Sequence, residues 1–166
     1  MAPWYALHVA SNMERQVSER LDRADIESYY PHSYLKSRDG RRNVQHKLIP
    51  GYVFARFEFS DRTPVIQIPQ VIRILGIGRE PVEIPAIEIE TVKLMSEQGA
   101  NVLAHPFFAA GESVYIRRGP LQGLEGFVVA SKPGKARVVV SVMMVQRSIS
   151  AEVDSADVES ILPRAA

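Results

Sequence analysis

The chain has 166 residues, of which 46% are hydrophobic and 23% are charged, with a formal net charge of +1 and no cysteine. This composition is typical of an ordinary folded chain of one or two small domains. It excludes disulfides, thiolate metal sites and a cysteine nucleophile, and no apolar run approaches the roughly 18 residues of a membrane span. Because the N-terminus also lacks the basic start of a secretory signal, we expect a cytoplasmic protein.

Strand and helix patterns alternate over the first 98 residues. Ser11 and Glu14 have the spacing of a capping box at the start of one helix, and Pro85 and Gly99 can open and end another. This alternation favours a sheet with helices packed on one face. The expected elements are strands at 4–9, 52–59 and 71–78, extended chain at 26–38, a short helix or turn at 62–71, and helices at 11–25 and 86–98.

The strand YVFARFEF at 52–59 carries aromatic residues on both of its faces. Alternation sorts Val53, Ala55 and Phe57 onto one face, whereas the other face begins with Tyr52 and Phe54 before it reaches charges. Aromatic side chains on a nominally wet face indicate a partner site. We therefore predict that both are at least partly exposed, or covered only by a neighbouring chain. The alternative is that the second domain or the linker covers them within the same chain.

Basic residues are concentrated in two stretches, 36–47 and 117–147. The segment DGRRN at 39–43 has turn composition, so the first stretch is expected to be a basic hairpin tip or loop whose side chains reach water and phosphates. A solvated charge run is the alternative. The first stretch has one acid, Asp39, and the second has six basic residues and only Glu125. The candidate nucleic-acid-binding residues are Lys36, Arg38, Arg41, Arg42 and Lys47.

After Gly111 the helical periodicity stops. Four or five short strands separated by Gly-Pro, Pro-Gly and polar turns predict a small all-β barrel, and residues 99–110 have the composition of a linker. The β-branched residues between 138 and 153 and the glycines at 119, 123 and 126 disfavour a helix. We predict no helix anywhere across Arg137–Val145. We also predict no autoinhibition, in which a helical form of this region would cover Tyr52 and Phe54.

The order of these motifs resembles the NusG family of bacterial transcription elongation factors. WYALHVASNMERQVSERL is similar to the start of its NGN domain, LIPGYVFARF to its central strand, and GESVYIRRGPLQGLEGFVV to its KOW motif. GPLQGLEG and RSISAEV look more like the specialised RfaH/UpxY-type members. The resemblance implies an α+β fold, with an N-terminal NGN α/β sandwich (an antiparallel sheet with helices) at 1–98, a linker at 99–110 and an SH3-like KOW barrel at 111–163.

The resemblance also implies partners and site residues. It implies a monomer that binds the clamp helices of the largest RNA polymerase subunit, suppresses pausing or termination, and makes weak DNA contact. The KOW domain would recruit a ribosomal small-subunit protein or Rho through Arg117, Arg118 and Leu121, the last expected to be exposed at a turn tip. The residues that fall where the family has its polymerase-binding patch are Trp4, His8, Ile49, Pro50, Tyr52 and Phe54.

Two other functions remain open from the sequence. One is a general NusG acting with Rho, and the other is a ribosome-associated KOW-type RNA-binding protein. The glycines at 76 and 78 and at 119, 123 and 126 lack the rest of a dinucleotide or phosphate loop, and the four histidines have no ligand spacing. We therefore expect no enzyme, no metal site and no cofactor.

Overall fold

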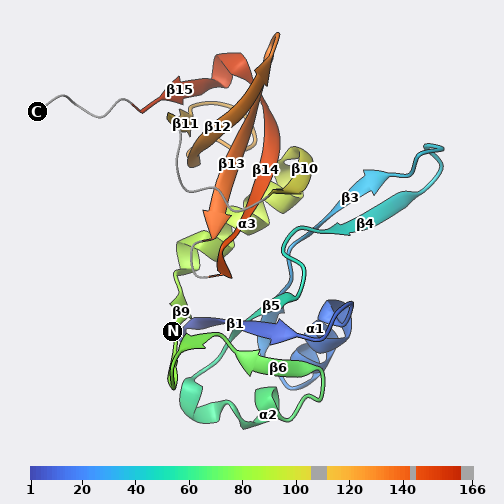
Figure 1. Ribbon diagram of the computed structural model, residues 1–166, viewed down its shortest axis with the longest axis vertical. Coiled ribbons are helices and arrows are strands. Elements are labelled where there is room, and N and C mark those ends of the chain that lie inside the picture. Colours follow the sequence, from blue (N-terminus) through green and yellow to red (C-terminus); the bar gives the residue numbers. More distant parts are fainter. Residues whose placement is uncertain (106–111, 143–144, 162–166) are drawn as a thin grey trace, which may run out of the picture. The chain divides into compact units, whose positions relative to one another are not determined.

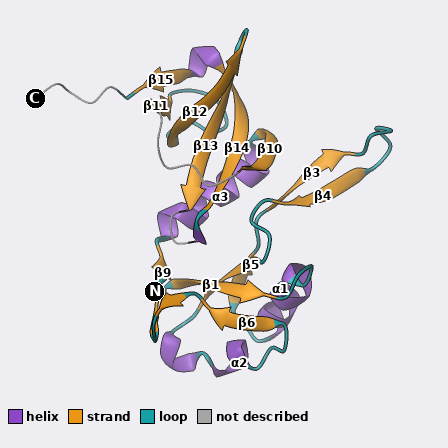
Figure 2. Cartoon of the chain, in the orientation of Figure 1, coloured by secondary structure: helices purple, strands orange, loops and turns teal. Residues whose placement is uncertain are grey.

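The computed structural model describes residues 1–105, 112–142 and 145–161. The chain divides into two compact units that are interleaved in sequence. The first unit contains Met1–Pro31 and Ile49–Ile89, and the second contains His32–Leu48 and Glu90–Ala166. Figure 2 shows helices and strands in both, so the α+β class predicted from the sequence is confirmed.

A five-stranded antiparallel sheet organises the first unit (Figure 1). Leu7 lies opposite Val53 on one neighbouring strand and opposite Ile74 on the other, which brings apolar residues of three strands together. The strand order is β2 (Glu27–Tyr29), β5 (Tyr52–Arg56), β1 (Trp4–Val9) and β6 (Val71–Ile74), with β9 (Glu83–Ile84) pairing with β1 as well.

Helices α1 (Glu14–Arg23) and α2 (Thr63–Ile66) contribute to the core on one face of this sheet. Val17 and Leu21 lie one helical turn apart and are fully buried, so α1 presents an apolar stripe to the strands. The residues predicted to point into the core from β5 do so. The buried core consists of Tyr5, Leu7, Val9, Val17, Leu21, Val53, Ala55, Phe57, Val65 and Ile68.

The predicted start of α1 is wrong by three residues. The helix begins at Glu14, its N-cap position is Met13, and no side chain caps it. Ser11 therefore does not form a capping box with Glu14. The prediction failed because the Glu14 carboxylate has a different partner, described below.

The helix predicted between Pro85 and Gly99 is confirmed as α3 (Ala86–Gln98). Before it, β7 (Gly76–Ile77) and β8 (Glu80–Pro81) form a small hairpin, and η1 (Phe59–Asp61) is a single 3-10 turn. Within the described part of the chain, no helix is long and apolar enough to cross a membrane.

The second unit contains a six-stranded antiparallel sheet. From residue 112 onward the described residues form strands and 3-10 turns, as the sequence predicted for this region. Residues 137–142 lie in a strand, residues 143–144 lie outside the described residues, and Val145 has 3-10 geometry just before the next strand. The strand order is β10 (Ala100–His105), β14 (Arg147–Asp154), β13 (Lys135–Val142), β12 (Glu125–Lys132), β11 (Glu112–Ile116) and β15 (Val158–Ser160), with a 3-10 turn, η3 (Ser155–Asp157), before β15.

The first of these strands, β10, lies in the segment that the sequence analysis assigned to a linker. It pairs with β14 through Leu103 opposite Ser150 and Ala104 opposite Ile149, and Val102 is buried. The linker prediction is therefore wrong for residues 100–105, while residues 106–110 lie outside the described residues. A short, mostly exposed edge strand has little of the apolar alternation from which strands are predicted.

The predicted basic hairpin is confirmed as β3 (His32–Lys36) paired with β4 (Asn43–Lys47). Figure 1 shows this ribbon ending in a turn that lies clear of the other strands of the same unit. At its base, Ser33 is buried and its hydroxyl donates a hydrogen bond to the Val102 carbonyl of β10, at 3.1 Å. The hairpin therefore belongs structurally with the second unit, although the sequence places it within the predicted NGN domain.

Candidate interaction surfaces

The sheet of the first unit has a second face, opposite the helix-covered core. Directly opposed residues of antiparallel strands point to the same side. The register pairs Ala6 with Phe54 and His8 with Tyr52. The second face is built from Trp4, Ala6, His8, Glu27, Tyr29, Tyr52, Phe54, Arg56, Arg73 and Ile84.

Most of the apolar part of this second face is buried. Phe54 is 0% exposed and Trp4 is 3% exposed, so the prediction that Phe54 is exposed or covered by a neighbouring chain is wrong. Other residues of the same chain cover Phe54. Alternation correctly placed Phe54 opposite the core, but a face made of large apolar side chains is stabilised by burial, by roughly 1.5–3 kcal/mol for each. Ile49, another predicted patch residue, is 1% exposed.

One end of the second face remains accessible. Tyr52 and His8 are half-buried, and Pro50, next to them in the chain, is exposed. The Tyr52 and His8 rings lie 5.5 Å apart between centroids and are inclined by 32°. On the other side of His8, the register brings the exposed Arg73. We call His8, Pro50, Tyr52 and Arg73 the aromatic end.

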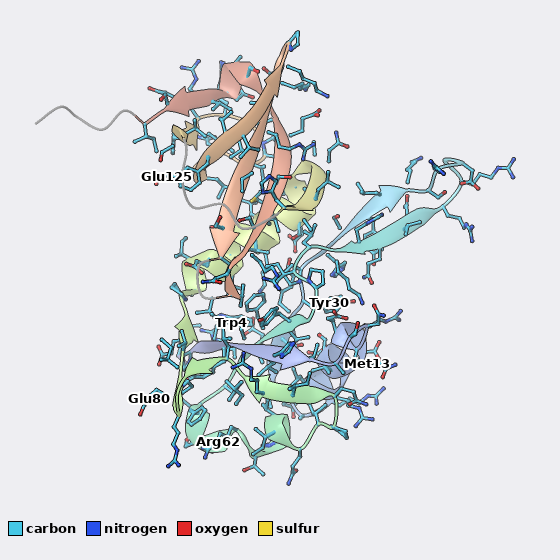
Figure 3. The ribbon with its side chains drawn as sticks, in the orientation of Figure 1. Trp4, Met13, Tyr30, Arg62, Glu80 and Glu125 are labelled. Atoms are coloured by element: carbon cyan, nitrogen blue, oxygen red, sulfur yellow. The ribbon has the colours of Figure 1, made fainter. Side chains whose placement is uncertain are left out.

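Arg56, at the opposite end of the second face, already contacts other residues of the first unit. Its guanidinium bonds the Glu27 carboxylate at 3.2 Å and the Ala2 carbonyl at 2.9 Å. It also lies 5.9 Å from the centre of the Trp4 ring. Figure 3 labels Trp4 among the side chains of this region. A guanidinium held at three points stabilises this end of the sheet rather than offering a free charge to a partner.

Glu14 holds the turn beside the aromatic end, and sequence reasoning missed this role. Its carboxylate accepts a hydrogen bond from the Gly51 N–H at 2.9 Å, while the Gly51 carbonyl accepts one from the Val9 N–H, also at 2.9 Å. Glu14 is only 2% exposed. Gly51 has a φ of 86°, a conformation that glycine adopts without strain. The Pro50–Gly51 turn is thus fixed from both β1 and α1.

The basic hairpin has an ordered tip. The Asp39 carboxylate accepts hydrogen bonds from the Ser37 hydroxyl and from the Arg41 N–H. The Ser37 hydroxyl and then the Arg41 N–H lower the pKa of Asp39, because both bonds favour its charged form. Of the five predicted basic residues, Lys47 is half-buried and the others are exposed: Lys36, Arg38, Arg41 and Arg42.

The Gly-Pro turn of the second unit differs from its prediction at one residue. Leu121 is 4% exposed, so it is part of the core and not an exposed anchor. The turn folds back on itself, with the Gln122 N–H bonded to the Gly119 carbonyl at 3.1 Å, which directs Leu121 inward. Arg117 and Arg118 are exposed as expected. Arg117 donates to the Ala156 carbonyl, and Arg118 pairs with an aspartate of η3 at 3.2 Å.

No group of three or more potential metal ligands occurs in the part of the chain that the structure describes. Among the described residues, the aromatic end and the basic hairpin are two candidate interaction surfaces. Neither has the set of convergent titratable groups that acid–base chemistry needs. Both have features of binding surfaces.

The comparisons with known proteins agree with this description. Residues 2–93 match the family described as "Transcription termination factor nusG". The transcription termination/antitermination protein NusG of Pseudomonas aeruginosa is 26% identical over 95% of this chain and 98% of its own length. The NusG protein of Haemophilus influenzae is 27% identical over 95% of this chain and 94% of its own.

A solved structure shares the fold across both units. The structure described as "Domain interaction in Thermotoga maritima NusG" aligns over 98% of each chain, with a TM-score of 0.59 and 21% identity. Since the family match covers more than half of the residues, the chain belongs to the NusG family of transcription termination factors. The more specific resemblance to RfaH/UpxY-type members stays a prediction.

Proposed function

We propose that this chain is a transcription elongation and antitermination factor that binds RNA polymerase through the aromatic end of its first unit. The observation that carries the proposal is the half-buried Tyr52–His8 pair, which lies at the accessible end of the otherwise buried second face. The chain that presents this pair belongs to the NusG family. Aromatic and arginine side chains dominate the binding energy of typical protein interfaces. Here Tyr52, His8 and Arg73 form one row across three strands.

The proposed partner is the clamp-helix region of the largest polymerase subunit, which the family resemblance suggests. A factor that bridges the two sides of the polymerase cleft binds the closed clamp better than the open one. Such differential affinity shifts the clamp population toward the closed, elongating state without any catalysis. Because Phe54 is buried, the proposed docking surface is smaller than the sequence predicted.

The second unit and the hairpin have separate proposed roles. Arg117 and Arg118 are exposed beside a turn that is fixed to η3, so they offer two positioned charges to a recruited partner. A ribosomal small-subunit protein and Rho are the candidates that the resemblance supplies. The exposed arginines of the hairpin tip would contact nucleic-acid phosphates near the polymerase.

The test is binding of purified RNA polymerase by the full chain, compared with Tyr52→Ala and His8→Ala variants. Removal of an interface anchor typically costs about 2 kcal/mol, which corresponds to roughly thirtyfold weaker binding. Ile77→Ala is a suitable control, because Ile77 is 78% exposed on a hairpin outside the second face. Wild-type affinity in both aromatic variants would remove the aromatic end from the interface. Co-purification from extract with ribosomes and not with polymerase would favour the ribosome-associated function.

A further inference from the structure

The hairpin of β3 and β4 has an outer face that its basic tip does not explain. The register pairs Tyr34 with Gln45 at the middle of the ribbon. Period-two alternation places the pairs on either side of it on the same face. The outer face therefore consists of His32, Tyr34, Lys36, Asn43, Gln45 and Lys47.

Tyr34 is the centre of this outer face and is unusually open. It is 62% exposed, and it is the only aromatic among the large apolar side chains that are exposed in the described residues. The ring is nevertheless held in place. His32 lies at 90° to it with 5.6 Å between centroids, and Gln45 donates to its hydroxyl at 3.5 Å.

The opposite face of the ribbon fixes which way Tyr34 points. Ser33 is buried at the base and bonds the Val102 carbonyl of β10. Because neighbouring residues of a strand point to opposite sides, the bond made by Ser33 leaves Tyr34 on the side away from β10. The aromatic ring is thus presented outward by a ribbon that is anchored at its base.

The electrostatic character of the ribbon is basic throughout. Residues 32–48 contain five lysines and arginines and a single carboxylate, that of Asp39. That carboxylate is occupied inside the turn by Ser37 and Arg41. The ribbon therefore presents positive charge on both sides of the ring, at Lys36 and Lys47, and at its tip, which favours a polyanionic partner.

We propose that the outer face of the hairpin binds single-stranded nucleic acid, with one base stacked on Tyr34 and the neighbouring phosphates on Lys36, Lys47 and the tip arginines. The inference deepens the phosphate contact in the proposed function and rests on it. Positively charged surfaces that carry exposed aromatic side chains bind unpaired strands without sequence readout, because every base has a flat π-face. In a duplex, those faces are stacked on neighbouring base pairs and cannot reach the ring.

The experiment measures fluorescence anisotropy of the full chain with labelled strands of about 12 nucleotides, a length suited to one small binding domain. The three probes are single-stranded DNA, single-stranded RNA of the same sequence, and the corresponding DNA duplex. The variants are Tyr34→Ala, Tyr34→Phe, Val44→Ala and the double variant Arg41→Gln with Arg42→Gln. Val44 is the matched control, since it lies on the opposite face of the same hairpin and is 42% exposed.

We expect Tyr34→Ala to weaken single-strand binding by roughly 5- to 150-fold, the range of one lost base stack. Tyr34→Phe keeps the ring and should retain binding within about twofold, and duplex binding should not change in either variant. The arginine double variant should instead lower the salt dependence with every probe. Tighter binding of the DNA strand or of the RNA strand shows which nucleic acid the site prefers. Either preference supports the stacking site.

Equal weakening of duplex and single-strand binding by Tyr34→Ala would overturn the proposal, as would equal losses in Tyr34→Ala and Val44→Ala. Unchanged single-strand binding in Tyr34→Ala would overturn it too. None of these results alters the polymerase test with Tyr52→Ala and His8→Ala, so failure of the stacking site and failure of the proposed function can be distinguished. Circular dichroism of each variant verifies that the fold is retained.

Discussion

Tyr52 and Phe54 stand two positions apart on β5 and share the second face of the sheet, but they differ in burial. Phe54 is fully buried and Tyr52 is only half-buried. We expect Phe54→Ala to lower the free energy of unfolding by about 3–5 kcal/mol, because it removes a large side chain and leaves a cavity. Tyr52→Ala should lower it by about 1 kcal/mol. Urea unfolding of the two single variants measures both values.

Equal losses of stability in these two variants would contradict the burial of Phe54. The double variant Tyr52→Ala with Phe54→Ala is a poor test of partner binding, because it is expected to destabilise the fold. Partner binding is better tested with His8→Ala and Tyr52→Ala, which alter the accessible end of the same face.

Glu14 provides a second prediction for a single residue. Glu14→Ala removes the acceptor of the Gly51 N–H, so we expect a loss of about 1–3 kcal/mol in unfolding free energy and faster amide exchange at Gly51. Glu14→Gln keeps an oxygen acceptor and should lose less. Glu19→Ala is the matched control, since Glu19 lies on the same helix and is half-exposed in a surface pair with Arg15. Slow Gly51 exchange in Glu14→Ala would show that the turn does not need this carboxylate.

The role of Glu14 also shows what the sequence could not supply at the level of residues. The capping-box spacing with Ser11 offered a local explanation for an acid at a helix start. Its actual partner is Gly51, 37 positions later, and no spacing rule connects the two. Leu121 is a similar case. Its position in a Gly-Pro turn suggested exposure, whereas the fold directs the side chain into the core.

Among the elements, the hairpin tip should respond to pH through Asp39. Its pKa is lowered in the folded chain by the Ser37 hydroxyl and the Arg41 N–H. A lowered folded pKa means that the stabilisation of the turn is present above the unfolded value, about 3.9, and is lost as pH falls through the folded value. We expect the Arg41 amide signal in NMR spectra to shift below about pH 4. Asp39→Asn should abolish this shift, and a shift that persists in Asp39→Asn would contradict the assignment.

Gly126 on β12 provides a second prediction at the level of elements. A Cβ at this position would lie 2.5 Å from the Val139 carbonyl oxygen and 2.9 Å from the Val138 side chain, so two strands of the second unit approach too closely for alanine. We expect Gly126→Ala to destabilise the second unit by about 1–3 kcal/mol or more. Gly123→Ala is the control, because a Cβ there meets nothing within 4 Å and only its φ of 94° opposes it. A smaller loss in Gly126→Ala than in the control would contradict the close approach.

Elements with strong local signals were predictable, and those made by tertiary pairing were not. Pro85 and Gly99 mark the ends of α3, and alternation gave the core face of β5. By contrast, β10 is a strand only because it pairs with β14, about 50 residues later in the chain. On their own, its residues have the composition of a linker. Tertiary pairing of this kind overrides local preference in short, exposed strands.

For the whole molecule, the main observation is that neither unit is a continuous stretch of sequence. The chain leaves the first unit at residue 31 and returns at residue 49, and the hairpin between belongs with residues 90 onward. The sequence predicted two successive domains because motif order gives no information on an excursion of this kind. The family and the fold class were nevertheless predicted correctly, and so was the β structure of the described residues from 112 onward.

Residues 137–142 of the second unit should remain a β-strand in all states of the molecule. Residues 137–142 form β13, paired on both sides, and Val138, Val139 and Val142 are buried. We therefore expect carbon chemical shifts of β type at residues 137–142 in the full chain, both free and with a saturating excess of RNA polymerase. Helical shifts at these residues in either state would contradict this expectation, as would loss of these signals from the free chain.

The bond between Ser33 and Val102 has a consequence for the synthesis of the chain. The two residues are 69 positions apart. Ribosomes add about 5–20 residues per second, so the carbonyl at Val102 is made roughly 3–14 s after the hydroxyl at Ser33. During that interval the tip of the hairpin can form its own local hydrogen bonds, whereas the bond between Ser33 and β10 at the base cannot yet form. A nascent chain that ends before Ala100 therefore carries a basic ribbon with a formed turn and no support at its base.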